Sequence, residues 1–269
     1  MRAAVLGSPI AHSKSPPLHR AAYAVLGLHD WTYDRIECTA EQLPALVGGF
    51  GREWVGVSVT MPGKVAALEF AHERTERAVL AGSANTLIRT AAGWRADCTD
   101  VDGVRGALEE NGIRNLTGRS VVVIGAGGTA RPAVIALAAL GAASVTVVAR
   151  SELRSRETLA CAQACGLDVA YLCVDDLGLA DVASRSAVVV STVPAVGVAP
   201  VAEMIANAPV VLDAIYDPWP TPLAQAVQRA GGTVVSGLEM LLNQAYGQVE
   251  QFTSLPAPRR AMRAALDIG

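Results

Sequence analysis

The chain has 269 residues, a length typical of one large domain or two small ones. Hydrophobic residues make up 51% and charged residues 17%, which excludes a disordered polyelectrolyte and supplies enough apolar side chains for a core. The net charge of -3 and the 4% of aromatic residues exclude the basic, base-stacking surface of a nucleic-acid-binding protein. We expect a small-molecule substrate, no nucleic-acid or membrane partner, and a monomer or homodimer.

Strand-like and helix-like runs alternate along most of the chain. Strands are predicted over 3–6, 32–36, 56–59, 86–89, 120–124, 144–149, 169–172, 187–191, 210–214 and 233–235. Helices are predicted over 17–26, 41–48, 101–111, 129–140, 152–165 and 222–230, and the chain reads as helical after residue 237. The alternation predicts an α/β protein with parallel sheets covered by helices.

The strand at Ser120 begins a second series of elements and leads into a glycine-rich turn. The terminal helices after residue 237 are expected to return to the first domain. We therefore predict a discontinuous first domain, 1–100 and 237–269, around an inserted nucleotide-binding unit, 101–236.

The five cysteines are odd in number and include no C-x-x-C pair, and the four histidines show no ligand spacing. This pattern predicts reduced thiols in a cytoplasmic protein and no metal site. The apolar run at the N-terminus is too short for a signal peptide. Two uncharged stretches, 132–149 and 186–202, are interrupted by proline, and we interpret them as buried α/β interior.

A glycine-rich turn follows the strand 120–124 and opens a helix. Its residues are Gly125, Ala126, Gly127, Gly128, Thr129 and Ala130, a G-x-G-x-x-A sequence. The glycines permit a tight turn and close approach to a pyrophosphate, which the free N–H groups of the helix start would bind. The alternative is a tight turn without a ligand.

The end of the next strand indicates which dinucleotide binds. Enzymes that use NAD usually place a carboxylate there, whereas this chain has Arg150 and Ser151, with Arg154 and Arg156 following. Guanidinium groups and a hydroxyl suit a 2′-phosphate, so the sequence favours NADP.

The first domain contains several polar motifs that the packing of its core does not require. Ser13 and Ser15 lie between a strand and a helix, where their hydroxyls would bind a carboxylate. The alternative is that Ser15 caps the helix and Ser13 lies in a turn. Lys64 is one of only two lysines against 20 arginines, and lysine, unlike arginine, can release a proton near neutral pH. Further motifs are Ser58-Val59-Thr60, Ser83-Ala84-Asn85-Thr86, Asp97-Cys98-Thr99-Asp100 and 237–245.

Taken in order, these motifs closely resemble the shikimate dehydrogenase family over nearly the whole chain. The resemblance implies an N-terminal α/β substrate domain and a Rossmann-like NADP domain, with the active site in the cleft between them. The reaction implied is the reversible reduction of 3-dehydroshikimate to shikimate with NADPH, on the route to chorismate and the aromatic amino acids.

The resemblance also implies a role for individual residues. Lys64 and Asp100 would form the catalytic pair. The substrate would be bound by Ser13, Ser15, Ser58, Thr60, Asn85, Tyr216 and Gln244. Beyond the turn 125–130, the cofactor would contact Arg150, Ser151, Arg154, Thr192, Gly237 and Met240.

Three positions depart from the family pattern. Ser58, Cys98 and Ala149 stand where the family usually has asparagine, so the substrate contact of position 58 is expected to be shortened or lost.

A quinate/shikimate dehydrogenase that uses NAD is the nearest alternative. A methylenetetrahydrofolate dehydrogenase/cyclohydrolase would need a pterin site that Ser13, Ser15 and Asp100 do not suit. A further alternative is a regulatory NADP sensor. The presence of both Lys64 and Asp100 argues against it, because a sensor would need no proton donor.

Overall fold

The protein, represented by a computed structural model that describes residues 1–266, divides into two units. Unit 1 contains Met1–Gly103 and Leu241–Gly269, and unit 2 contains Val104–Met240. The boundaries between the two units fall inside the helices α5 (Asp100–Glu110) and α12 (Gly237–Thr253). The domain boundaries predicted from the sequence, 100/101 and 236/237, lie a few residues before them. Residues 267–269 of the predicted segment 237–269 lie outside the described residues.

Unit 1 is built around a sheet with the strand order β2-β1-β3-β5-β6-β4. Its elements are β1 (Arg2–Gly7), α1 (Ser15–Val25), β2 (Thr32–Glu37), α2 (Leu43–Gly48), β3 (Trp54–Val59), α3 (Lys64–Phe70), β4 (Glu73–Arg74), α4 (Glu76–Ala81), β5 (Thr86–Thr90), β6 (Gly93–Asp97), the start of α5, most of α12, and α13 (Arg259–Ala264).

The expectation of a parallel sheet is wrong for part of unit 1. Strand β5 runs antiparallel to both β3 and β6, because β5 and β6 form a hairpin around Ala91 and Ala92. Strand β6 was not among the predicted strands, since in its polar segment only Trp94 and Ala96 are apolar and buried. The short elements β4, α3 and α4 were also not predicted.

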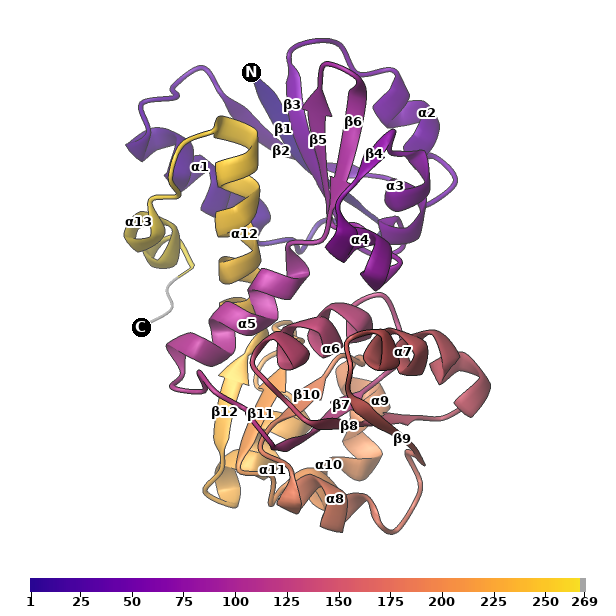
Figure 1. The fold of residues 1–269 in the computed structure, drawn as a ribbon. Helices are drawn as coiled ribbons and strands as arrows, with labels where there is room; N and C mark the ends of the chain where they lie inside the picture. Colours follow the sequence, from indigo (N-terminus) through magenta and orange to yellow (C-terminus); the bar gives the residue numbers. More distant parts are fainter. Residues whose placement is uncertain (267–269) are drawn as a thin grey trace. The chain divides into compact units, whose positions relative to one another are not determined.

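Helices cover both faces of this sheet (Figure 1). Ala3 and Val5 of β1 point to a core that includes Leu242 and Val249 of α12 and also side chains of α1 and α13. The alternate β1 residues point to a second core with α2 and α3. Burial of both faces explains the continuous apolar strand. Most of α12, from Leu241, and α13 belong to unit 1.

Unit 2 has a parallel sheet with the order β12-β11-β10-β7-β8-β9. Its elements are β7 (Ser120–Ile124), α6 (Ala130–Ala139), β8 (Ser144–Ala149), α7 (Glu152–Ala164), β9 (Asp168–Cys173), α8 (Leu179–Arg185), β10 (Val189–Ser191), α9 (Ala195–Val198), the 3-10 helix η1 (Ala199–Val201), α10 (Ala202–Ile205), β11 (Val210–Asp213), α11 (Pro222–Arg229) and β12 (Thr233–Ser236).

The predicted strands and the longer predicted helices are confirmed, whereas the short helices α8 to α10 and η1 were not predicted. Helices α8, α10 and α11 pack on the face of the sheet that presents Val122 and Ile124, and α6 and α7 lie on the other side (Figure 1). This is the two-sided α/β arrangement of a dinucleotide-binding domain.

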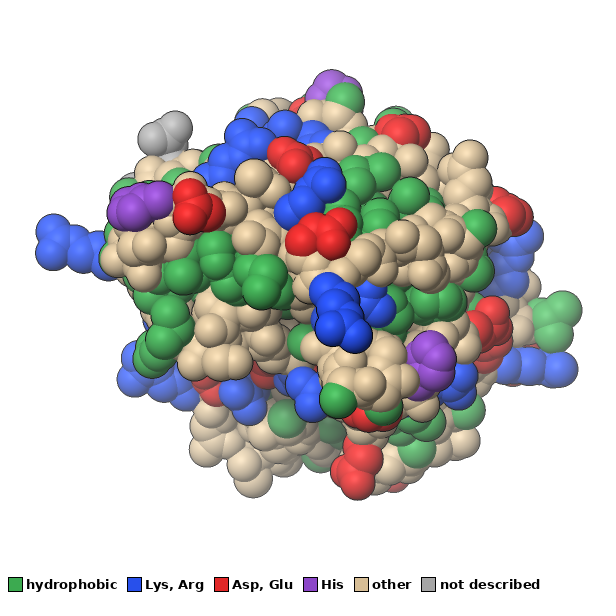
Figure 2. Space-filling view, turned by 90° about the horizontal axis from the view of Figure 1, so that it is seen from above, with side chains coloured by type: hydrophobic (Ala, Val, Ile, Leu, Met, Phe, Trp, Pro, Cys, Tyr) green, Lys and Arg blue, Asp and Glu red, His purple; other side chains and the backbone are tan. Residues whose placement is uncertain are grey.

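Within residues 1–266, no helix is long and apolar enough to cross a membrane. On the face that Figure 2 shows, basic and acidic side chains are interspersed. The cysteines form no disulfide in the described part of the chain.

Candidate active site

Four segments of unit 1 meet at one edge of its sheet. Strands β1 and β3 are parallel neighbours that end there, whereas β5 begins there and β6 ends there because this pair is antiparallel. The register places Ser58 opposite Thr86, and Thr86 opposite Asp97. The segments that follow β1, β3 and β6 and the one that precedes β5 therefore converge.

Lys64 and Asp100, which begin α3 and α5, form an ion pair at this edge. The Lys64 Nζ donates to Asp100 Oδ2 at 2.5 Å, and the two side chains are 16% and 7% exposed. Partial burial reduces screening by water, so this pair is stronger than one on the open surface. The second oxygen of Asp100, Oδ1, accepts a hydrogen bond from Asn85 Nδ2 at 2.9 Å. Both carboxylate oxygens are thus held by side chains of unit 1.

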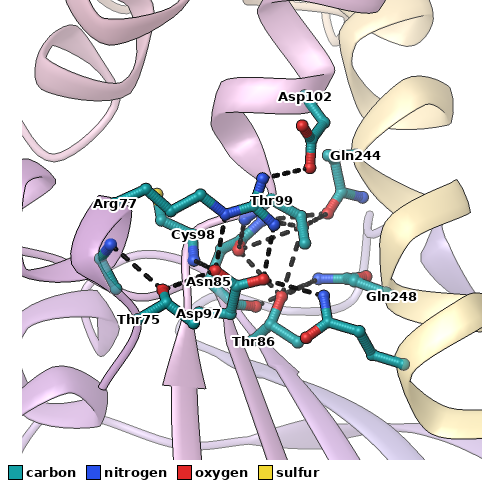
Figure 3. A network of polar contacts seen from close by, with 12 residues as sticks. Thr75, Arg77, Asn85, Thr86, Asp97, Cys98, Thr99, Asp102, Gln244 and Gln248 are labelled. Atoms are coloured by element: carbon teal, nitrogen blue, oxygen red, sulfur yellow. Dashed lines mark hydrogen bonds and ion pairs between the residues drawn. The ribbon is translucent and has the colours of Figure 1, made fainter.

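Asn85 connects this pair to α12, and Figure 3 shows the contacts of Asn85 with Thr99 and with Gln244 of α12. Its Oδ1 accepts a hydrogen bond from the Thr99 backbone N–H at 2.8 Å, which leaves its Nδ2 to face Asp100 and Gln244. Gln244 Oε1 accepts from Nδ2 at 3.1 Å. Helix α12 approaches closely here, since a Cβ atom on Gly247 would lie 3.3 Å from Thr99 Cγ2. The structure therefore brings together Lys64, Asp100, Asn85 and Gln244.

Ser13, Ser15 and Thr60 lie in the segments that follow β1 and β3. Helix α1 begins at Ser15 with Lys14 as its N-cap and no side-chain cap hydrogen bond, so the Ser15 hydroxyl does not cap the helix. The Ser13 Oγ accepts from the Ser15 N–H at 3.3 Å. A Cβ atom on Gly7 would collide with the Thr60 side chain, so glycine allows the end of β1 to lie against Thr60.

The buried Ser58 hydroxyl has protein partners on both sides. It accepts a hydrogen bond from Tyr33 OH at 2.7 Å and donates one to Gln248 Oε1 at 2.7 Å. Because its single hydrogen is directed at Gln248, Ser58 has no donor left for a substrate.

Cys98 lies beside the ion pair but is fully buried. Burial, together with the nearby Asp100 carboxylate, raises the pKa of the Cys98 thiol well above its ordinary value. The thiol therefore stays protonated, which argues against a nucleophilic role.

An ion-pair network with no counterpart in the sequence predictions is formed by Arg77, Asp97 and Asp102 (Figure 3). Arg77 of α4 pairs with Asp97 and Asp102, and Gln251 of α12 donates to Asp97 Oδ2 at 2.9 Å. Burial alone would raise the pKa of Asp97, but the hydrogen bonds and charge of Arg77, with Thr75 and Gln251, lower it to about 2. This network joins α4, β6 and α12 beneath the site.

In unit 2 the glycine-rich turn lies between β7 and α6. Gly125 has φ of +111°, and a Cβ atom there would collide with Thr192 Oγ1, which donates to the Ile124 carbonyl at 2.9 Å. By contrast, a Cβ atom on Gly127 would have no neighbour within 4 Å. The turn is therefore closed by packing at Gly125 and open at Gly127, as a pyrophosphate-binding turn requires.

The other predicted cofactor residues lie near ends of the same sheet. Arg150 and Ser151 follow β8, the parallel neighbour of β7, and Arg154 is in the first turns of α7; both arginines are exposed. Gly237 and the buried Met240 begin α12 after β12, where a Cβ atom on Gly237 would collide with the Ala214 carbonyl. Tyr216 also belongs to unit 2 and follows β11. No cluster of metal-ligating side chains occurs among the described residues.

The chain is similar to known proteins over almost its full length. It is 37% identical over 271 residues to a shikimate dehydrogenase (NADP(+)) of Halobacterium salinarum, which covers 97% of each chain. The chain belongs to the shikimate dehydrogenase family. Two models of this family also match, the shikimate dehydrogenase substrate binding domain over residues 5–87 and the shikimate 5'-dehydrogenase C-terminal domain over 237–266.

Solved shikimate dehydrogenases share the fold. The Mycobacterium tuberculosis enzyme is 59% identical with a TM-score of 0.93, covering 98% of both chains. The Thermus thermophilus enzyme, solved in complex with NADP(H) and shikimate, is 29% identical with a TM-score of 0.83 and the same coverage. The matched family models include Lys64, Asn85 and Gln244, whereas Asp100 and the glycine-rich turn lie outside the matched ranges and rest on the geometry above.

Asp97 is expected to stabilise unit 1 in a pH-dependent way. Since its pKa is lowered from 3.8 to about 2, its contribution is complete above pH 3.8 and is lost as the pH falls towards 2. The shift corresponds to about 2 kcal/mol of unfolding free energy. Urea unfolding should therefore show Asp97→Asn to be less stable than the wild type at pH 7, with a difference that shrinks below pH 4.

The exposed Asp34, which pairs with Arg20 on the surface, provides the control. Asp34→Asn should change stability by well under about 1 kcal/mol at every pH. A destabilisation by Asp97→Asn that stays the same between pH 7 and pH 3 would contradict the role of the Asp97 charge.

Proposed function

We propose that the protein is an NADP-dependent shikimate dehydrogenase that reversibly reduces 3-dehydroshikimate to shikimate, a step of the shikimate pathway to chorismate. The observation that carries this proposal is the partly buried Lys64–Asp100 pair, whose second carboxylate oxygen is held by Asn85. Family membership also supports the proposal. The Lys64–Asp100 pair supplies the proton that the reduction of a ketone needs in addition to the hydride.

The substrate residues have complementary chemistry. Ser13 and Ser15 would donate hydrogen bonds to the carboxylate, while Thr60, Asn85 and Gln244 would bond the ring hydroxyls, with Tyr216 as a further contact. Ser58 would serve as an acceptor only, because its hydrogen is directed at Gln248. A site built from hydroxyls and amides discriminates against analogues that leave one of these groups unpaired.

The proton transfer falls to Lys64. NADPH, when bound, supplies the hydride, and the carbonyl oxygen then needs a proton. The Lys64 ammonium donates that proton and its charge stabilises the developing alkoxide. Asp100 holds the ammonium through Oδ2 and offers its remaining lone pairs to a ring hydroxyl of the substrate. In the direction of shikimate oxidation, the same lysine accepts the proton.

The cofactor would bind along the edge of the unit 2 sheet. The pyrophosphate would lie over Gly125–Ala130, where the open space above Gly127 admits it. Arg150, Ser151 and Arg154 would bind the 2′-phosphate that distinguishes NADP from NAD. Thr192, Gly237 and Met240 would contact the remainder of the dinucleotide.

We further propose a cytoplasmic location and an assembly no larger than a homodimer. The described cysteines form no disulfide, which fits a reducing compartment.

Replacement of Lys64 tests the proton transfer. Lys64→Ala should lower kcat for shikimate oxidation by about 10²–10⁴-fold, the contribution typical of a general acid or base, while shikimate still binds. Absorbance of NADPH follows turnover, and calorimetry follows binding. The exposed Lys14 serves as the control, and Lys14→Ala should retain full turnover. Lost affinity with unchanged kcat would instead make Lys64 a binding residue.

Ser13→Ala and Ser15→Ala should act mainly on substrate affinity. Each removes a hydrogen bond to a charged group, so the KM for shikimate should rise about 10- to 150-fold. Ser184→Ala, at an exposed serine of unit 2, should leave KM unchanged. A normal KM combined with a lower melting temperature would show that the two serines serve only the fold.

Arg150→Ala tests the choice of cofactor. The loss of one charge-assisted contact should weaken NADP by about 10- to 150-fold and leave NAD almost unaffected. High salt should reduce the preference of the wild type for NADP, because the arginine is exposed. The exposed Arg185 provides the control variant, Arg185→Ala. Equal efficiency of the wild type with NAD and NADP would favour the NAD-dependent quinate/shikimate alternative.

A further inference from the structure

Gln248 is a buried residue of α12 that the catalytic scheme does not use. It is 1% exposed, and its amide contacts the other elements of unit 1 on both sides. Its Nε2 donates to the Asn85 carbonyl at 3.1 Å and to Thr86 Oγ1 at 3.0 Å. Its Oε1 accepts from Ser58 Oγ at 2.7 Å and lies 3.3 Å from His19 Nε2. All the hydrogen-bonding capacity of this amide is therefore used inside the protein.

The chemistry of these partners allows a single orientation of the Gln248 amide. The Asn85 carbonyl can only accept a hydrogen bond, so Gln248 Nε2 must face it. Thr86 Oγ1, which accepts from the same Nε2, must then direct its own hydrogen elsewhere. It lies 2.9 Å from Asn85 Oδ1, which accepts that hydrogen.

The orientation of Gln248 is passed to Thr86 and Asn85, which lie next to it in Figure 3, and from Asn85 to the catalytic pair. Asn85 Oδ1 accepts from both the Thr86 hydroxyl and the Thr99 N–H. With both donors on the oxygen side, Asn85 Nδ2 must point to Asp100 Oδ1, 2.9 Å away. Asp100 then presents Oδ2 to Lys64.

The other side of Gln248 leads to the start of α1. Because Gln248 Oε1 can only accept, Ser58 must donate to it and accept from Tyr33 OH. His19, stacked on the Tyr33 ring at 3.9 Å, carries its hydrogen on Nε2 for the same reason, and burial lowers its pKa to about 3.

We propose that Gln248 is a positioning residue that sets the direction of this hydrogen-bond chain. It thereby adds the Thr86 hydroxyl to the Thr99 N–H as the second donor that fixes the Asn85 amide against Asp100. The proposal rests on the proposed function, since Lys64 and Asp100 are its catalytic pair. Gln248 contacts neither of them and acts through Thr86 and Asn85. Gln244, one helical turn away, holds the Asn85 side chain, whereas Gln248 holds the Asn85 backbone and orients the hydroxyl beside it.

Gln248→Met keeps the length and apolar stem of the side chain but removes its donors and acceptor. The Thr86 hydroxyl is then free to rotate away from Asn85, and Asn85 retains one donor on its oxygen instead of two. We expect kcat for shikimate oxidation to fall about tenfold, the upper range for the loss of one hydrogen bond between neutral groups. The KM for NADP should stay unchanged, because the residues proposed to bind NADP lie in unit 2.

Two substitutions at Thr86 separate the hydroxyl from packing. Thr86→Val preserves the shape of the side chain and removes the hydroxyl, so it should lose about as much kcat as Gln248→Met. Thr86→Ser keeps the hydroxyl and should retain kcat within about twofold, which only a hydrogen-bonding role predicts. Gln251→Met, on the same helix but directed at Asp97, should lower the melting temperature without lowering kcat.

The outcomes separate this proposal from the proposed function. A wild type that does not oxidise shikimate with NADP overturns the proposed function. An active wild type with full kcat in Gln248→Met overturns the positioning role, even if the variant is less stable. Equal kcat losses in Thr86→Val and Thr86→Ser also overturn it, because packing would then explain the effect.

Discussion

The arrangement of unit 1 depends on the need to hold both oxygens of one buried carboxylate. Asp100 is 5% exposed, and an unpaired charge at such depth would be costly. Lys64 satisfies Oδ2 and Asn85 satisfies Oδ1, each from a different segment of the sheet edge. The antiparallel β5–β6 hairpin makes this possible, because it brings the start of β5 and the end of β6 to the edge where β1 and β3 end.

Each polar group that holds the carboxylate is buried and needs partners in turn. Asn85 is 2% exposed and Thr86 fully buried, so in the ligand-free protein their hydrogen bonds come from protein groups. Helix α12 supplies them through Gln244 and Gln248, and through Gln251 to Asp97. This explains in physical terms why a C-terminal helix belongs to the N-terminal unit: its apolar face completes the core and its polar row completes the site.

The sequence predicted the features that have local patterns. The apolar strands and the glycine-rich turn were predicted from local patterns, and Lys64, Asp100, Asn85 and Gln244 were selected as site residues through short motifs and the family resemblance that these motifs carry. The Ser58–Gln248 bond, in contrast, joins residues separated by 190 positions, and no local pattern indicates it. A usable signal was the recurrence of glutamine at 244, 248 and 251, a spacing that places the three side chains on one face of the helix. The ion pairs of Arg77 with Asp97 and Asp102 were missed for the same reason, since the groups of this network come from different elements.

The most direct test of this account is whether the Lys64–Asp100 pair exists before any ligand binds. The chain contains two lysines, so protein labelled with ¹⁵N-lysine gives at most two ammonium signals in a proton–nitrogen correlation spectrum. An ammonium held by a carboxylate and largely removed from water exchanges its protons slowly, whereas that of the exposed Lys14 exchanges rapidly. We predict one ammonium signal in the ligand-free wild type that persists in Lys14→Arg and disappears in Asp100→Asn. A wild-type spectrum without this signal, or an unchanged signal in Asp100→Asn, would contradict the account.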